Sequence, residues 1–386
     1  MLPSNHVPLI PLTASLEGVS PLHLAGRRLR RNVAALLGGV VIGGAGLVAV
    51  LGYLILPDAS PDANAAVVAL QKQLPGFTVP VVAVRRTEVP PPTSWWAGLL
   101  FGRAPATRLV PTARLVPLGA DSVFLEAPTA LGLPAGAGEA IRRTELVSAN
   151  DTRAVPLTRK TYYLGTDRAG RDVLSRLLLG TRVSLGIGLV AALLSLVLGA
   201  TVGAVGGYFG GWPDRAARFL MTVIWSVPGI MLVVAISLAV GSKGAWVTFV
   251  AVGLTMWVDV ARVVRGQVLS LREKPFIEAQ RVLGLGTARI VAYHLLPNML
   301  GPLIVVTTAN FASAILLEAG LSFLGLGVQP PAPSWGLMVS EGFQLLGTQA
   351  GFWLTLLPSL AISLLVLAFN LLGNGLRDAF DPTTPA

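Results

Sequence analysis

The chain has 386 residues, of which 53% are hydrophobic and only 12% are charged, and its mean hydropathy is +0.70. A soluble domain has about 25% charged residues, so this composition excludes a soluble globular enzyme and indicates a membrane protein. Lys and Arg outnumber Asp and Glu by 29 to 19. On an apolar chain, such an excess is more typical of cytoplasmic membrane flanks than of nucleic-acid binding. With 0 cysteines and 3 histidines, the sequence offers little support for a metal centre or a Ser-His-Asp arrangement.

Six apolar stretches are each long enough for a helix that crosses a bilayer, which takes about 20 residues. They cover 34–56, 183–209, 219–240, 246–264, 300–326 and 352–376. Four arginines precede the first stretch, which is interpreted as an uncleaved anchor after a tail of residues 1–33. Because basic flanks stay in the cytoplasm, both termini, including the tail 377–386, are predicted to be cytoplasmic. The fold class is therefore an all-α, multi-pass membrane protein with six transmembrane helices.

Small residues and prolines interrupt several of these stretches. Gly199, Gly203 and Gly207 recur at helical spacing, which predicts a close approach of a neighbouring helix. Pro228 and Pro358 are interpreted as ordinary kinks in the third and sixth spans.

Residues 57–160 differ from the rest because they are rich in proline and charge. The β-branched runs 78–84 and 107–116 predict some strand content, hence a small mixed outer domain inserted between the first two helices. Within it, the tryptophans and leucines of 95–101 suit either the membrane interface or a buried cluster, and both interpretations stay open.

The loop 265–297 between the fourth and fifth spans is predicted to carry a short cytoplasmic helix over 276–283. Pro275 suits the first turn of a helix, and Gly284 suits its far end. The helix has more apolar residues than a solvated loop needs, which predicts a partner with a groove. These residues are Phe276, Ile277, Val282 and Leu283.

Part of this loop resembles a family signature. Glu278-Ala279-Gln280, then Gly284 and Leu296-Pro297, resemble the EAA motif of the permease subunits of bacterial ATP-binding cassette (ABC) importers, with Gln280 where alanine is usual. The resemblance implies a coupling helix that docks on an ATP-binding subunit. It assigns coupling to Phe276, Ile277, Glu278, Ala279, Gln280, Gly284, Leu296 and Pro297.

Segments 164–176, 316–336 and 370–382 narrow the resemblance to the peptide and nickel branch, and within it to the C-type permease of dipeptide and oligopeptide importers. The resemblance covers about 20–56 and 160–383 and implies the type I importer permease fold. It also implies a second homologous permease, one or two ATP-binding subunits and an extracytoplasmic peptide-binding protein. The chain has no phosphate-binding loop motif, so ATP and magnesium are expected on the partner subunits, and no cofactor or metal on this chain.

A polar motif occupies the outer segment 161–182. Its residues are Gly165, Thr166, Asp167, Gly170, Arg171, Asp172 and Arg176. We expect a turn followed by an interfacial helix, with Asp172 and Arg176 one helical turn apart. Contact with a partner protein and a purely structural role both remain open.

Two acids lie within predicted spans and are candidates for the translocation path. Glu318 suits either a site for the amino end of a peptide or a structural hydrogen bond. Asp259 lies one turn from Arg262, which predicts an ion pair.

The sequence thus predicts a permease subunit of the inner membrane, without a catalytic site, that moves di- or oligopeptides through an ATP-driven importer. Lipid surrounds it, and nucleic acid is not a partner. Import of nickel or another small solute is the alternative within transport. An intramembrane enzyme or a stand-alone channel is the rival from another class, but either would leave the docking helix unexplained.

Overall fold

The computed structural model describes residues 21–88, 90–91, 93–134, 136–147, 157–241 and 245–380. The tail 1–20, the outer-loop residue Lys243 and the end 381–386 lie outside the described residues.

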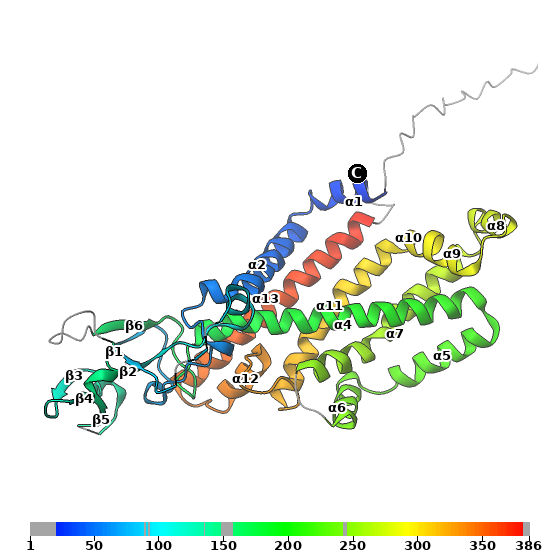
Figure 1. Ribbon diagram of the computed structural model, residues 1–386. Helices are drawn as coiled ribbons and strands as arrows, with labels where there is room; N and C mark the ends of the chain where they lie inside the picture. Colours follow the sequence, from blue (N-terminus) through cyan, green and yellow to red (C-terminus); the bar gives the residue numbers. More distant parts are fainter. Residues whose placement is uncertain are drawn as a thin grey trace, which may run out of the picture.

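The α-helices are α1 Pro21–Leu29, α2 Val33–Ile55, α3 Trp95–Phe101, α4 Val173–Phe209, α5 Gly211–Trp225, α6 Gly229–Val240, α7 Ala245–Leu271, α8 Pro275–Val282, α9 Thr287–Ile290, α10 Leu296–Asn298, α11 Leu300–Phe323, α12 Trp335–Phe343 and α13 Gln349–Phe380. The strands are β1 Phe77–Arg85, β2 Thr107–Pro111, β3 Arg114–Pro117, β4 Ser122–Glu126, β5 Gly138–Arg142 and β6 Thr158–Tyr162. Short 3-10 turns lie at Pro61–Ala63, Val68–Leu70, Thr129–Leu131 and Arg143–Glu145, and a π-helical turn at Val291–Leu295. Figure 1 shows the strands at one end of the helical bundle and α8 at the other.

Among the described residues, five helices are long and apolar enough to cross a membrane: α2, α4, α7, α11 and α13. The predicted third span is not one straight helix. It is the pair α5 and α6, bent by 94°, and counting this pair as a single span gives up to six. The bend lies just before Gly229, where Pro228 has no N–H to continue a helix and has a fixed backbone angle. Pro358, in contrast, lies inside the continuous helix α13.

Helix α4 starts earlier than hydropathy indicates. It has 37 residues, which corresponds to about 55 Å, against a bilayer core of about 30 Å. The interfacial helix expected before the second span is therefore the first part of α4 itself, and α4 is long enough to project beyond the apolar core of a bilayer.

Close helix contacts form where glycine replaces a larger residue. A Cβ atom on Gly199 would lie 2.5 Å from Val260 Cβ of α7, and one on Gly203 would lie 2.5 Å from the Ala261 carbonyl oxygen. The close approach predicted from the glycine spacing is thus confirmed, and α7 is the neighbour. A second close contact joins α2 to α13, since a Cβ on Gly38 would lie 2.5 Å from the Ala368 oxygen.

The segment between α2 and α4 folds into two antiparallel, three-stranded sheets with the orders β2-β1-β6 and β3-β4-β5. Val82, Val84, Val123, Leu125 and Ile141 form a core that both sheets share. Arg108 of β2 forms an ion pair with Glu139 of β5, and this pairing lowers the pKa of Glu139. The strands include the two runs that the sequence predicted.

Candidate functional site

Two groups of motif residues lie at opposite ends of the bundle (Figure 1). The first surrounds α8. The helix predicted over 276–283 is confirmed as α8, Pro275–Val282, with Pro275 in its first turn. Gly284 ends it with a φ of +75°, a left-handed conformation that glycine adopts without strain. The Leu283 N–H donates to the Ala279 oxygen at 3.0 Å, and the Leu285 N–H donates to the Gln280 oxygen at 3.1 Å.

Most of the predicted coupling residues are exposed. Phe276, Glu278, Ala279, Gly284 and Pro297 face outward, while Gln280 and Leu296 are half-buried. Val282, which lies between Gln280 and Gly284, is 83% exposed. A helix that leaves an apolar surface in this position has an unfilled contact face.

Ile277 is the exception among them. Its side chain is fully buried in a cluster with Val264 and Val268 of α7 and Leu303 of α11. It therefore anchors α8 to two long helices and does not contact a partner directly. The linker from α7 to α8 has only three residues, so α8 is also tied closely to the end of α7.

Three arginines in or near α8 contact residues of α4 and α5. Arg272 Nη1 donates to the Gly207 oxygen at 2.9 Å, near the carboxyl end of α4, where a cation interacts favourably with the helix dipole. Arg281 lies over the Tyr208 ring, 5.2 Å from its centroid. Arg265 holds Asp214 of α5 through two contacts of 2.5 and 2.9 Å. No local sequence pattern indicates these contacts, because the partners lie more than 50 residues away in the chain.

Two depressions flank α8. One, of about 890 Å³, is lined by Gln280, Leu285, Ala288, Arg289, Ala292, Tyr293 and His294. The other, of about 460 Å³, is lined by Tyr208, Arg272, Glu273, Glu278 and Arg281. The first depression has a mixed apolar and polar lining, and the lining of the second is mostly charged.

The second group of motif residues is a tight loop before α4. Gly165 and Gly170 have φ of +77° and +76°. A Cβ on Gly170 would overlap the Val67 oxygen, so only glycine fits this contact. Thr166 Oγ1 accepts a hydrogen bond from the Gln73 N–H at 2.9 Å and donates to the Leu70 oxygen. The loop is thereby fixed against residues 67–73.

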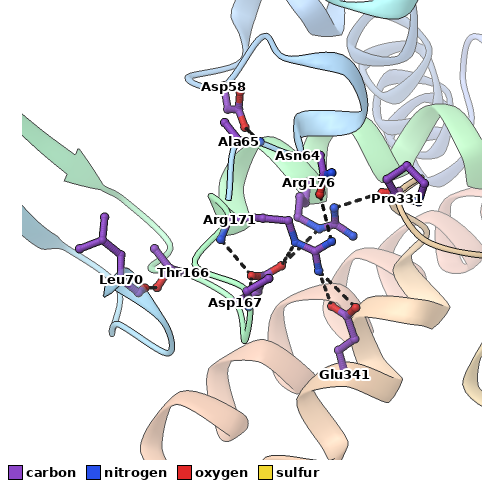
Figure 2. A network of polar contacts seen from close by, with 11 residues as sticks. Asp58, Asn64, Ala65, Leu70, Thr166, Asp167, Arg171, Arg176, Pro331 and Glu341 are labelled. Atoms are coloured by element: carbon purple, nitrogen blue, oxygen red, sulfur yellow. Dashed lines mark hydrogen bonds and ion pairs between the residues drawn. The ribbon is translucent and has the colours of Figure 1, made fainter. Parts of the chain in front are cut away.

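Asp167 is the centre of this loop (Figure 2). Its Oδ1 accepts from the Arg171 N–H at 2.9 Å, and its Oδ2 accepts from Arg171 Nε at 2.6 Å. Arg176 Nε lies 3.6 Å from the same Oδ2. All three side chains are buried. One carboxylate therefore pairs with two buried guanidinium groups, and a second carboxylate, that of Glu341, completes the charge balance.

The two arginines extend the network to distant segments. Arg171 Nη2 lies 3.2 Å from both carboxylate oxygens of Glu341 on α12, and its Nη1 lies 3.3 Å from Asn64 Oδ1. Arg176 Nη1 donates to the Pro331 oxygen at 3.3 Å. We name Asp167, Arg171, Arg176 and Glu341 the charge clamp. It joins the start of α4 to α12 and to the segment after α2.

Asp172 has a different role from the one predicted by its spacing. It caps α4, because its Oδ2 accepts from the Ser175 N–H at 2.8 Å. Ser175 Oγ accepts in turn from the Asp58 N–H at 2.9 Å. Burial raises the pKa of Asp172, and the hydrogen bonds from Ser175 partly offset this effect. Arg176, one turn later, pairs with Asp167 instead.

The two candidate acids of the translocation path occupy contrasting positions. Glu318 is fully buried in α11, and its Oε1 accepts from Ser322 Oγ at 2.6 Å. Ser322 Oγ also accepts from the Val328 N–H at 3.2 Å, whereas Glu318 Oε2 is buried without a hydrogen-bond partner in the described part of the chain, so both roles stay predictions. Asp259 is exposed, and among the described residues it has no ion pair. Arg262 lies over the Trp225 ring at 4.2 Å, so the predicted Asp259–Arg262 pair is not formed.

Two family models match this chain. A family model described as "Binding-protein-dependent transport system inner membrane component" matches residues 181–384. A second, the N-terminal TM domain of oligopeptide transport permease C, matches residues 20–72. The sheets lie between the two matches.

Several curated relatives are similar over more than half of the chain. The oligopeptide transport system permease protein OppC of Escherichia coli (strain K12) is 44% identical over 221 residues, 57% of this chain and 72% of that protein. The dipeptide transport system permease protein DppC of Alkalihalophilus pseudofirmus is 40% identical over 223 residues, with 57% and 72% covered. The glutathione transport system permease protein GsiD of Pectobacterium atrosepticum is 42% identical over 221 residues, with the same shares.

Among solved structures, an inward-facing MetNI methionine ABC transporter matches with a TM-score of 0.44 and 22% identity, over 54% of this chain and 97% of that chain. The extent of the family match and the identity to the curated relatives are decisive. The chain therefore belongs to the family of binding-protein-dependent transport system inner membrane components and is a permease subunit of an ABC importer.

Proposed function

We propose that this permease moves di- and oligopeptides into the cell, with ATP and magnesium bound by partner subunits that dock on α8. The observation that carries the proposal is α8 itself, whose outward face is uncovered while Ile277 fixes it to α7 and α11. A helix held in this way transmits the movement of a docked subunit to the membrane helices.

Peptide is the favoured substrate class because of the relatives. The curated relatives described above are named for the transport of oligopeptides, dipeptides and glutathione, which is itself a tripeptide. These names support peptide over nickel.

The assembly follows from the same proposal. The chain pairs with a second homologous permease, and one or two ATP-binding subunits close beneath them. An extracytoplasmic binding protein delivers the peptide. We place α8 and both termini in the cytoplasm, the sheets outside, and the bent pair α5 and α6 as the third of six spans. The basic residues Arg265, Arg272 and Arg289 near α8 support this orientation.

The experiment is uptake of labelled di- and oligopeptides, with nickel in parallel, in cells that lack this gene and in cells to which it is restored. Loss and rescue of peptide uptake are expected, together with co-purification of an ATP-binding subunit with the tagged chain. Unchanged peptide uptake with reduced nickel uptake would overturn the peptide assignment. Absence of an ATP-binding subunit from the purified complex would overturn the docking role of α8.

A further inference from the structure

The short helix α3 exposes an unusual amount of apolar surface. It has the sequence WWAGLLF and begins after Ser94, whose Oγ accepts from the Ala97 N–H at 3.2 Å. Trp96 is 67% exposed and Phe101 is 70% exposed, and Trp95 and Leu100 are each more than half exposed. Of the two interpretations of this segment, the buried cluster is therefore wrong. Four exposed large side chains on seven residues need a partner.

Helix α3 is fixed beside the end of α2. The Arg182 guanidinium of α4 donates to the Ala49 oxygen at 2.6 Å and to the Val50 oxygen at 3.2 Å, both of α2. The same guanidinium donates to the Leu100 oxygen at 2.5 Å, near the carboxyl end of α3. One side chain thus holds backbone oxygens of α2 and α3 together.

A second contact fixes the end of α3. Gly102, with a φ of +80°, packs so closely that an added Cβ would lie 2.7 Å from Tyr53 Cε1 of α2. The next N–H, of Arg103, donates to the Ala59 oxygen at 2.8 Å. The position of α3 is therefore determined by α2 and by the chain that follows α2.

These contacts set the depth of α3. Val50 lies five residues before the end of α2 at Ile55, about 8 Å along the helix. At this level α2 is still a membrane-spanning helix, and its side chains Val50 and Leu54 are 62% and 61% exposed. The exposed side chains of α3 are thus at the level of the outward surface of α2.

We propose that α3 is an interfacial anchor, which inserts Trp95, Trp96, Leu100 and Phe101 into the lipid bilayer beside α2. Tryptophan is enriched at the membrane–water boundary, because its ring is apolar and its N–H is polar. The anchor holds the two sheets against the membrane surface. The inference rests on the membrane placement of the family and is independent of the substrate.

The test uses the full-length chain. It has 0 cysteines, so a single introduced cysteine is the only site that a thiol-reactive spin label can modify. Trp96→Cys and Phe101→Cys are spin-labelled in vesicles of phosphatidylethanolamine and phosphatidylglycerol. Accessibility is measured to oxygen, which concentrates in lipid, and to chromium oxalate, which stays in water. Val40→Cys, exposed on α2, is the lipid control, and Leu118→Cys, exposed between β3 and β4, is the water control.

We expect spin labels at positions 96 and 101 to be less accessible to chromium oxalate than the label at position 118. Their accessibility to oxygen should be close to that of the label at position 40. Chromium oxalate accessibility equal to that at 118 would show that α3 lies in water and would overturn the proposal. Low accessibility to both reagents would show that a protein covers α3, and would overturn it as well.

Discussion

The charged residues of the motifs at the two ends of the helical bundle differ in their burial. In the charge clamp, Asp167, Arg171 and Arg176 are buried and find their partners within the chain. Around α8, Glu273 and Glu278 are exposed. Both motifs combine charge with glycine in sequence, yet one is complete within the subunit and the other is open to a partner. Burial, and not composition, distinguishes these two motifs.

Asp167→Ala tests the completeness of the charge clamp and has the largest expected effect. It leaves two buried guanidinium groups without their shared carboxylate, and removal of one partner from a buried ion pair costs about 3–5 kcal/mol. The free energy of unfolding should fall by this amount, measured as a lower thermal midpoint in detergent. Arg168→Ala is the control, since Arg168 is exposed in the same loop. Equal shifts in the two variants would contradict the clamp.

Gly170→Ala tests the fit of the loop that carries the clamp. The new Cβ would overlap the Val67 oxygen, in addition to the strain of a positive φ, which is about 1–2 kcal/mol. The matched variant is Gly76→Ala, because Gly76 has a φ of +82° and a Cβ added there would have no atom within 4 Å. Gly170→Ala should therefore lower the thermal midpoint further than Gly76→Ala. A smaller shift than that of Gly76→Ala would show that the loop is free to move.

Ile277→Ala tests the attachment of α8 to α7 and α11. Truncation of a buried isoleucine costs about 2–5 kcal/mol, here concentrated on the attachment of α8. Hydrogen exchange of the α8 amides should accelerate, while exchange in α2 stays unchanged. Val282→Ala, on the exposed face of the same helix, should change neither. Unchanged exchange in Ile277→Ala would mean that Ile277 does not anchor the helix.

The apolar spans were predictable because they depend on local composition. The expected 34–56 and the observed α2, Val33–Ile55, differ by one residue at each end. The start of α4 was not predictable, because Arg176 and Arg182 interrupt its hydropathy. Arg176 pairs with Asp167, and Arg182 donates hydrogen bonds to backbone oxygens of α2 and α3, which no local pattern reveals.

The functional motifs were predictable as positions and not as contacts. The helix α8 followed from Pro275 and Gly284, which are local signals. The partner of Arg171 did not, because Glu341 is 170 residues away in sequence. A kink at Pro228 was predicted, but its size of 94° was not. Hydropathy reports whether a segment is apolar, but it does not report the direction of the chain on either side of Pro228.

Glu278→Lys separates stability from function, because it should change the free energy of unfolding least and transport strongly. Glu278 is exposed, and a surface substitution of this kind changes the free energy of unfolding by no more than about 0.5 kcal/mol. The reversed charge, however, opposes docking of the ATP-binding subunit, since like charges at an interface repel. We expect a normal thermal midpoint together with loss of peptide uptake and of peptide-stimulated ATP hydrolysis. Asp121→Lys, exposed between β3 and β4 at the other end of the molecule, is the control for charge alone. Normal coupled uptake in Glu278→Lys would show that the open end of the bundle is not the docking surface.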